Sequence, residues 1–164
     1  MRLYERYAEL LPDGPARIRA AATVRSIAGW VGPFDLDRFG ATLAPAVEAV
    51  DHRTLGTWSA QGKEALLEHM RALVALAEGI VLCDDDVLGL RPDALLVRRR
   101  HRGTDRASGG EYERQFLLLW TFGADGLGTR QELFDPDHEA EALARFDELT
   151  TELLAAAPAA APAR

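Results

Sequence analysis

Four strand-like segments follow one another between residues 80 and 134, and the short links between them limit the folds that this chain can adopt. The expected strands cover residues 80–90, 93–102, 111–122 and 127–134. Gly, Pro and Asp are common in the links, which favours turns. Consecutive strands with such links must pair antiparallel, because a parallel crossover needs about a dozen residues or more. The sequence therefore predicts an antiparallel meander.

Amphipathic helices are expected on both sides of the meander, because apolar residues recur there at three- and four-residue spacing. The expected helices cover residues 2–11, 15–31, 35–44 and 62–77, and a last helix begins with Asp135 as N-cap and Pro136 in its first turn. Residues 46–53 alternate between apolar and polar side chains, which predicts an additional strand. Helices are the only available cover for an apolar sheet, so we expect an α+β fold. Its curved antiparallel sheet is covered by N-terminal and C-terminal helices and encloses a cone-shaped hollow.

The length of 164 residues suits one domain. We expect an N-terminal helical extension over residues 1–13, the domain itself over 14–154, and a disordered Ala/Pro tail over 155–164. The abundance of Ala and Arg over Lys is typical of GC-rich bacterial genomes.

Charge and cysteine content exclude several classes of protein. The net charge of −7 argues against a nucleic-acid partner, which would require a cationic surface. No apolar run has the length of about eighteen residues that a membrane span needs. Cys83 is the only cysteine, which excludes an intramolecular disulfide and favours a cytoplasmic location.

The strand expected at residues 111–122 carries the most informative pattern. Side chains alternate along a strand, so one face would present Tyr112, Arg114, Phe116, Leu118, Trp120 and Phe122. Arg114 then points inward among aromatic rings, where a guanidinium needs a carboxylate or an anionic ligand. The alternatives are a structural ion pair or a position at the wet rim of the hollow.

Asp51 and His52 are the candidate catalytic residues, because a carboxylate and an imidazole can exchange protons with a substrate. Neighbours on a strand face opposite ways, so either Asp51 and Arg53 together or His52 alone can face the hollow. The alternative role for all three is to fix the following loop through hydrogen bonds.

Other charged groups are expected to form ion pairs or to be solvated. Arg130 and Glu132 share a strand face and are expected to form an ion pair. The basic run 98–102 is expected to pair with Glu111 and Glu113, and the acidic run 84–86 to be a solvated turn. The four histidines lack metal-ligand spacing, so no metal and no cofactor are expected.

Several local signatures, taken in order, resemble the SnoaL-like branch of the nuclear transport factor 2-like (NTF2-like) superfamily over residues 16–150. They are Ile27-Ala28-Gly29-Trp30, Phe34-Asp35-Leu36-Asp37-Arg38-Phe39, the stretch from Leu55 to Leu67 with Gly62, Phe122-Gly123-Ala124-Asp125-Gly126, and Glu132-Leu133-Phe134-Asp135. The resemblance implies the cone-shaped α+β fold described above. It does not imply one activity, because the superfamily includes isomerases, epoxide hydrolases, cyclases and non-catalytic accessory domains.

The resemblance can be tested at the positions of the family's catalytic residues. The isomerase-type general base falls near Arg53, and on Asp51 only after a small shift. The protonated acid of the isomerases falls on Leu118, which cannot donate a hydrogen bond to an enolate. The epoxide hydrolases of the family use an Asp-Arg-Asp group. Asp51 with Arg114 or Arg130 would match only part of that group.

Three functions follow from these patterns. The first is a small-molecule-binding or regulatory accessory domain, whose apolar or anionic ligand would contact Trp30, Phe34, Trp58, Tyr112, Arg114, Phe116, Leu118, Trp120 and Arg130. The second is an isomerase, cyclase or hydratase that uses Asp51 or His52 as general base, which leaves open whether the chain is an enzyme. The third is a module that forms a homodimer through exposed sheet surface.

Overall fold

The computed structural model describes residues 2–56 and 58–156. The described helices are α1 (Arg2–Leu10), α2 (Pro15–Ala28), α3 (Leu36–Ala41), α4 (Lys63–Leu76) and α5 (Glu139–Ala156). The expected helices are therefore present, and most of the expected Ala/Pro tail lies outside the described residues. No described helix has the length and apolar character that crossing a bilayer requires.

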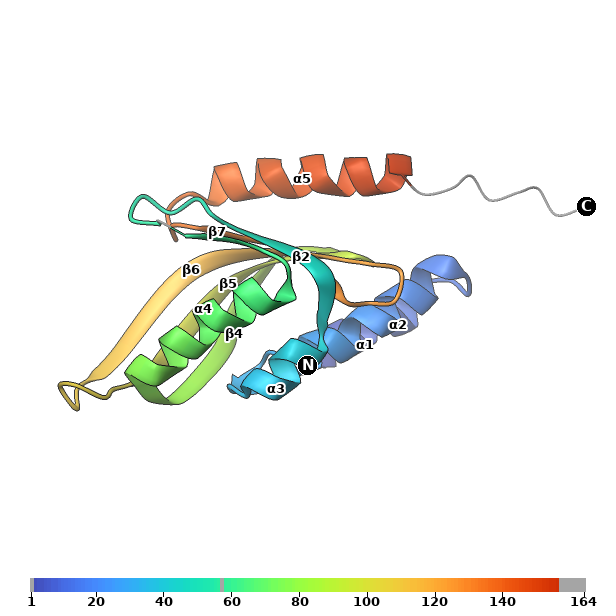
Figure 1. Ribbon diagram of the computed structural model, residues 1–164. Coiled ribbons are helices and arrows are strands. Elements are labelled where there is room, and N and C mark those ends of the chain that lie inside the picture. Colours follow the sequence, from blue (N-terminus) through green and yellow to red (C-terminus); the bar gives the residue numbers. More distant parts are fainter. Residues whose placement is uncertain (1, 57, 157–164) are drawn as a thin grey trace, which may run out of the picture.

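One sheet contains all the described strands. They are β1 (Gly32–Pro33), β2 (Leu43–Asp51), β3 (Ser59–Gln61), β4 (Ala77–Arg91), β5 (Ala94–Asp105), β6 (Glu111–Phe122) and β7 (Gly128–Phe134). Their spatial order is β1-β4-β5-β6-β7-β2-β3, with the expected antiparallel meander from β4 to β7. Strand β4 has three register shifts against β5, and such irregularities bend a strand, which is consistent with the curvature of the sheet in Figure 1.

The sheet is not antiparallel throughout, because β2 pairs parallel with β7. A parallel pairing is possible here because β3 to β6 lie between the two strands in the sequence, which leaves ample chain for a crossover. The expected helix over residues 35–44 is also too long: α3 ends at Ala41 and β2 begins at Leu43. Pro45 lies within the irregular stretch of β2 between Leu43 and Glu48, where an absent N–H is tolerated.

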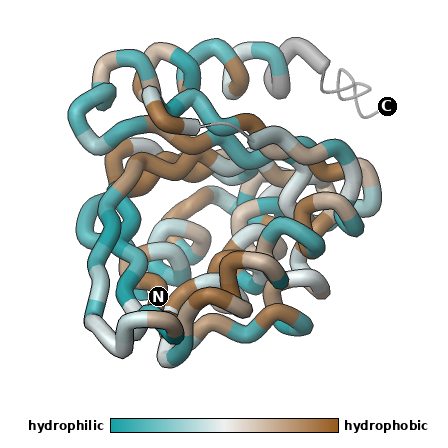
Figure 2. Tube along the Cα trace, turned by 60° about the vertical axis from the view of Figure 1, so that its left-hand side comes forward, coloured by the Kyte–Doolittle hydropathy of each residue, from teal (hydrophilic) through white to brown (hydrophobic). Residues whose placement is uncertain are grey.

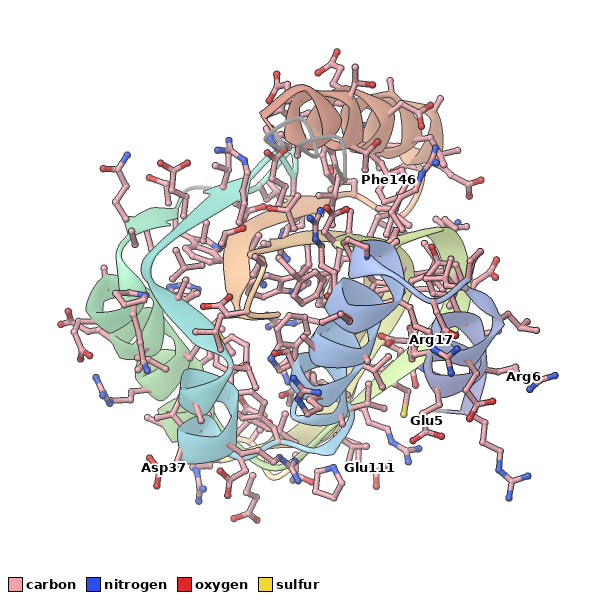
Figure 3. The ribbon with its side chains drawn as sticks, turned by 90° about the vertical axis from the view of Figure 1, so that its right-hand side faces the viewer. Glu5, Arg6, Arg17, Asp37, Glu111 and Phe146 are labelled. Atoms are coloured by element: carbon pink, nitrogen blue, oxygen red, sulfur yellow. The ribbon has the colours of Figure 1, made fainter. Side chains whose placement is uncertain are left out.

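Helices cover both faces of the sheet. Helices α1 to α4 lie on the concave side and α5 lies alone on the convex side (Figure 1). Hydrophobic segments follow the strands between these two layers (Figure 2). The concave core contains Trp30, Phe39, Leu66, Leu67, Leu118 and Trp120 among others, and the convex core contains Leu96, Leu117, Leu119, Phe134, Phe146 and Leu149. Phe146 points from α5 toward the sheet, whereas Arg6 of α1 points outward (Figure 3).

The last helix begins later than expected, at Glu139 instead of at Asp135. The Asp135 carboxylate does not cap it. One of its oxygens accepts hydrogen bonds from the backbone N–H and the hydroxyl of Thr54, both at 2.7 Å. Asp135 directly follows β7, so it holds the loop after β2 against the end of β7.

Candidate functional site

A cavity of about 220 Å³ lies between the concave face of the sheet and helix α4. Helix α4 contributes one wall, formed by His69, Met70, Leu73 and Val74. These residues recur at one-, three- and four-residue spacing, so one face of α4 supplies them all. An apolar protein cavity of about 150 Å³ can hold one benzene molecule. The cavity is therefore large enough for a small organic ligand.

The sheet forms the opposite wall through alternating residues of its strands. Strand β6 contributes Arg114, Phe116, Leu118 and Trp120, β5 contributes Arg99 and His101, β7 contributes Gln131 and Leu133, and β4 contributes Ile80 and Leu82. Side chains alternate between the two faces of a sheet, so this row points to the concave side while Leu117 and Leu119 point to α5. Phe34, Phe39, Arg53 and Trp58 complete the lining.

Six of the nine residues predicted to bind ligand line this cavity: Phe34, Trp58, Arg114, Phe116, Leu118 and Trp120. Arg114 was expected to be buried, but it is not. It is exposed and its guanidinium lies 5.5 Å from the centre of the Tyr112 ring, which places it at the mouth of the cavity. Its predicted carboxylate partner is absent among the described residues, so the position at the wet rim is the correct alternative.

The other three predicted binding residues lie outside the cavity lining. Trp30 is buried against Trp120, with ring centres 4.3 Å apart, and its indole N–H bonds to Thr42. Tyr112 lies further along β6, where its hydroxyl is 3.2 Å from a ring nitrogen of His101. Arg130 forms ion pairs with Glu48 and, as expected, with Glu132.

Asp51 and Arg53 form a bidentate ion pair, in which Arg53 Nε and Nη2 donate to the carboxylate at 2.8 and 2.6 Å. The Asp51 side chain is fully enclosed, and Arg53 reaches the cavity wall. The strand alternation thus places this pair, and not His52, on the concave side.

His52 faces the convex side, where it stacks on Phe134 and its Nε2 lies 2.8 Å from Glu132 Oε2. Glu132 is fully buried and also accepts hydrogen bonds from Arg130 and Arg145. Burial raises the pKa of Glu132, but the hydrogen bonds from Arg145, Arg130 and His52 outweigh it and lower the pKa below its ordinary value. This cluster attaches α5 to the sheet, and the His52 side chain does not line the cavity.

The acidic run of β4 pairs with the basic run of β5, which corrects two expectations. Asp84 is not a solvated turn residue: its Oδ1 accepts from Arg99 Nε at 2.6 Å, and both side chains are less than a tenth exposed. Asp85 pairs with Arg100 at 2.7 Å. Glu113, the expected partner of the basic run, lies 3.7 Å from Arg100 and therefore contributes less to the pairing than Asp85 does.

Three residues of the cavity wall carry a buried polar atom without a hydrogen-bond partner among the described residues. These atoms are Arg99 Nη2, Trp120 Nε1 and Gln131 Oε1. A buried polar group without a partner costs about 1–3 kcal/mol, and folded proteins rarely leave one unsatisfied. Only one other such atom, Arg100 Nε, occurs in the described chain. The three atoms are themselves enclosed by protein, so they lie behind the surface of the cavity.

His69 and His101 place two imidazoles in the cavity wall. Burial lowers the pKa of His69 and Arg53 lowers it further, although Asp51 opposes the shift. Burial also lowers the pKa of His101, as does the positive charge of Arg114. Both rings are therefore neutral at neutral pH and can accept a proton or a hydrogen bond. His69 also stacks on Trp58 with ring centres 3.8 Å apart.

These lowered pKa values make the stability depend on pH. Below the ordinary histidine pKa of 6.5, the unfolded chain binds protons at His69 and His101 that the folded protein does not. Their contribution to the free energy of unfolding is complete above that pH and declines as the pH falls toward the lowered values. We expect urea denaturation to show a lower free energy of unfolding at about pH 5.5 than at about pH 7.5. A double variant, His69→Gln with His101→Gln, should flatten this slope, and an unchanged slope would contradict the assignment.

Four polar residues of the wall were not predicted from the sequence, although the alternation of side chains along a strand identifies three of them. Arg99 and His101 are two and four residues from Val97 of the concave core, and Gln131 is two residues from Leu133. His69 adjoins Met70 in the apolar stripe of α4. Among the described residues, no group of His, Cys, Asp and Glu is arranged to hold a metal ion.

Comparison with known proteins supports the fold alone. No protein-family model matches the sequence, and no curated protein matches it significantly. Solved structures do match. A protein from Jannaschia sp. CCS1 that is described as a SnoaL-like polyketide cyclase superposes with a TM-score of 0.58 at 18% identity, over 83% of this chain and 96% of that one. The fold is NTF2-like.

Two further solved structures superpose on this chain at similarly low sequence identity. The BvnE pinacolase from Penicillium brevicompactum matches with a TM-score of 0.59 at 13% identity, over 80% of this chain and 97% of that one. A hypothetical protein with a ketosteroid isomerase-like fold from Catenulispora acidiphila, solved in complex with trimethylamine, matches with a TM-score of 0.54 at 16% identity, over 68% of this chain and 82% of that one. The predicted SnoaL-like, NTF2-like architecture is thus confirmed. Sequence identities this low do not transfer the roles of individual residues to this chain.

Proposed function

We propose that this NTF2-like protein binds a small molecule in the cavity between α4 and the concave face of the sheet. The observation that carries the proposal is the cavity itself, a space of about 220 Å³ whose wall is mainly apolar and includes a few polar side chains. Ligand sites are usually apolar with a few polar groups that fix orientation, and this wall has that composition. The trimethylamine complex supports the idea that the NTF2-like fold can hold a small molecule.

The charges of the wall favour a ligand with an anionic or carbonyl oxygen. Arg53, Arg99 and Arg114 all line the cavity, and none of the described lining residues carries a carboxylate. Arg53 and Arg99 are neutralised in part by Asp51 and Asp84, whereas Arg114 has no ion-pair partner among the described residues. Arginine presents several N–H donors that fit a carboxylate well.

An enzyme of the isomerase, cyclase or hydratase class is the second candidate, and the neutral imidazoles favour it. His69 and His101 lie in the cavity wall with lowered pKa values, so either can act as general base at neutral pH. Asp51 and His52 are less suited to that role. Asp51 is enclosed by Arg53, and His52 is bonded to Glu132 on the convex side.

Filling the cavity tests whether it binds ligand. Naphthoate, an apolar bicyclic carboxylate, should bind the wild-type protein with one-to-one stoichiometry in isothermal titration calorimetry. We expect Leu73→Trp to reduce the affinity about tenfold or more, because the indole would occupy the cavity. Leu76→Trp is the matched control: Leu76 lies three residues further along α4, is 64% exposed and does not line the cavity.

Two results would contradict the binding proposal. One is a wild-type protein that does not bind naphthoate, and the other is equal affinity in the two tryptophan variants. Circular dichroism and thermal melting of both variants establish that each is folded before binding is compared.

A further inference from the structure

The wall of the cavity changes from buried to exposed along strand β6. Trp120 and Leu118 are 1% and 2% exposed, Phe116 is half-buried, and Arg114 is exposed. These four residues share the concave face and follow one another in two-residue steps of about 7 Å. The cavity therefore has an inner part at Leu118 and Trp120 and an outer part at Phe116 and Arg114.

The inner part of the wall is formed mainly by apolar side chains. Leu133 is paired with Leu118 in the sheet register, and the Phe39 ring lies 6.3 Å from that of Trp120. The indole nitrogen of Trp120 is enclosed by protein, so the ring offers a ligand its carbon surface. A charged group placed in this part would lose its hydration without gaining a charged partner. The inner part therefore suits the apolar body of a ligand.

Arg53 is a fixed hydrogen-bond donor in the outer part. Its guanidinium carbon lies 5.8 Å from the centre of the Phe116 ring, and its Nε and Nη2 donate to Asp51. A guanidinium carries five N–H groups, so Arg53 keeps donors that Asp51 does not use. The Arg53 side chain is 29% exposed and lines the cavity. Asp51 thus sets the orientation of these donors before any ligand binds.

Arg114 adds a charge that no described residue balances. It precedes Phe116 by two residues on the same face of β6, and it has no ion-pair partner among the described residues. Exposed side chains change rotamer within nanoseconds, so Arg114 can turn from the Tyr112 ring toward a ligand. Because Asp51 offsets the charge of Arg53, the outer part has one positive charge in excess, which suits a ligand group with one negative charge.

The volume of the cavity limits the size of the ligand. A space of about 220 Å³ exceeds the roughly 150 Å³ that holds one benzene molecule by enough for a short chain. Phe116 and Trp120 are four residues apart, which corresponds to about 13 Å along the strand. One six-membered ring with two or three additional carbon atoms fits this space and spans both parts of the wall.

We infer that the preferred ligand is a small monocarboxylic acid with one apolar ring, which binds with its carboxylate at Arg53 and Arg114 and its ring at Leu118 and Trp120. This inference rests on the proposed function, because it assigns the chemical class and the orientation of the molecule that enters the same cavity.

Three compounds test the two halves of the ligand by calorimetry. Phenylpropanoate has the charged group and the ring, phenylpropanamide has a neutral group of the same shape, and propanoate lacks the ring. We expect the amide to bind about tenfold to a hundredfold more weakly than the acid, because charged hydrogen bonds are lost. Propanoate should bind about a hundredfold more weakly or worse, because it buries little apolar surface. An amide or a propanoate that binds as tightly as phenylpropanoate would overturn the inference.

Variants assign the preference for the charged group to the two arginines. Arg114→Gln should reduce the preference for acid over amide severalfold and leave the affinity for the amide unchanged. The double variant Asp51→Asn with Arg53→Gln should do the same, and it avoids leaving a carboxylate buried without its partner. Arg102→Gln is the control, since Arg102 is exposed on β5 and does not line the cavity. A full preference in both folded variants would refute the assignment.

The orientation is tested on the wild-type protein, so this result does not depend on how the variants fold. Para-bromophenylpropanoate carries a bromine atom at the end opposite to its carboxylate, and anomalous X-ray scattering locates that atom in a crystal of the complex. We expect the bromine next to Leu118, Leu133 or Trp120. A bromine atom next to Arg114 would reverse the orientation and overturn the inference.

The two proposals fail in different ways. If neither naphthoate nor any of these compounds binds, the cavity is not a ligand site and both proposals fall. If naphthoate binds and phenylpropanoate binds no better than its amide, the cavity remains a ligand site and only the assigned class and orientation are wrong.

Discussion

Replacing Asp84 by Ala should lower the free energy of unfolding by about 3–5 kcal/mol, the cost expected when one partner of a buried ion pair is removed. The side chains of Asp84 and Arg99 are 7% and 4% exposed, so the substitution leaves the Arg99 guanidinium buried without its carboxylate. Asp84 Oδ2 also accepts a hydrogen bond from the Tyr4 hydroxyl at 3.0 Å. Burial and the charge of Asp84 raise the pKa of Tyr4, so this hydroxyl keeps its proton and ties α1 to the sheet.

Urea denaturation measures this effect, and a neighbouring ion pair provides the control. Asp85 pairs with Arg100 in a more exposed position, so Asp85→Ala should cost about 1 kcal/mol or less. The double variant Asp84→Leu with Arg99→Met replaces the pair by apolar side chains and should recover most of the stability. Equal losses in Asp84→Ala and Asp85→Ala would show that the Asp84–Arg99 pair is not buried as described.

Replacing Phe146 by Ala should lower the free energy of unfolding by a similar amount, about 3–5 kcal/mol, because it opens a cavity in the convex core. Phe146 is 4% exposed and packs so closely on β4 that a Cβ at Gly89 would lie 2.9 Å from its ring. None of the described side chains of α5 lines the ligand cavity, so the affinity for naphthoate should stay the same.

The loss of stability in Phe146→Ala, together with an unchanged affinity for naphthoate, tests whether the concave and convex cores are independent. Leu143→Ala is a graded control, since Leu143 is only partly buried on the same helix and should cost less. Urea denaturation and calorimetry on the same protein samples give both quantities. A loss of naphthoate affinity in folded Phe146→Ala protein would mean that the convex core shapes the cavity after all.

Local patterns in the sequence were sufficient for the meander and for one wall of the cavity. Alternation along β6 identified Arg114, Phe116, Leu118 and Trp120, because a strand of known direction has only two faces. The same run also contains Leu117 and Leu119, so its apolar character is continuous. Such continuity is typical of strands that are buried on both faces, and it would have predicted that helices cover both sides of the sheet.

Pairings between strands could not be read from the sequence. Asp84 lies opposite Arg99 only because β4 has register shifts on both sides of it, between Glu78 and Val81 and between Asp84 and Asp86. A shift of one residue would exchange the two faces, and no local signal fixes where a bulge occurs. The parallel pairing of β2 with β7 likewise depends on contacts between distant segments.

The most direct test of the cavity as a ligand site is the indole N–H region of a proton–nitrogen correlation spectrum. The chain has three tryptophans, and Trp→Phe variants assign their resonances. Trp120 and Trp58 line the cavity, whereas the Trp30 indole donates to Thr42 in the core. On saturation with naphthoate, we predict large shifts for Trp120 and Trp58 and a small one for Trp30. Binding that saturates while the Trp120 resonance stays in place would contradict the account.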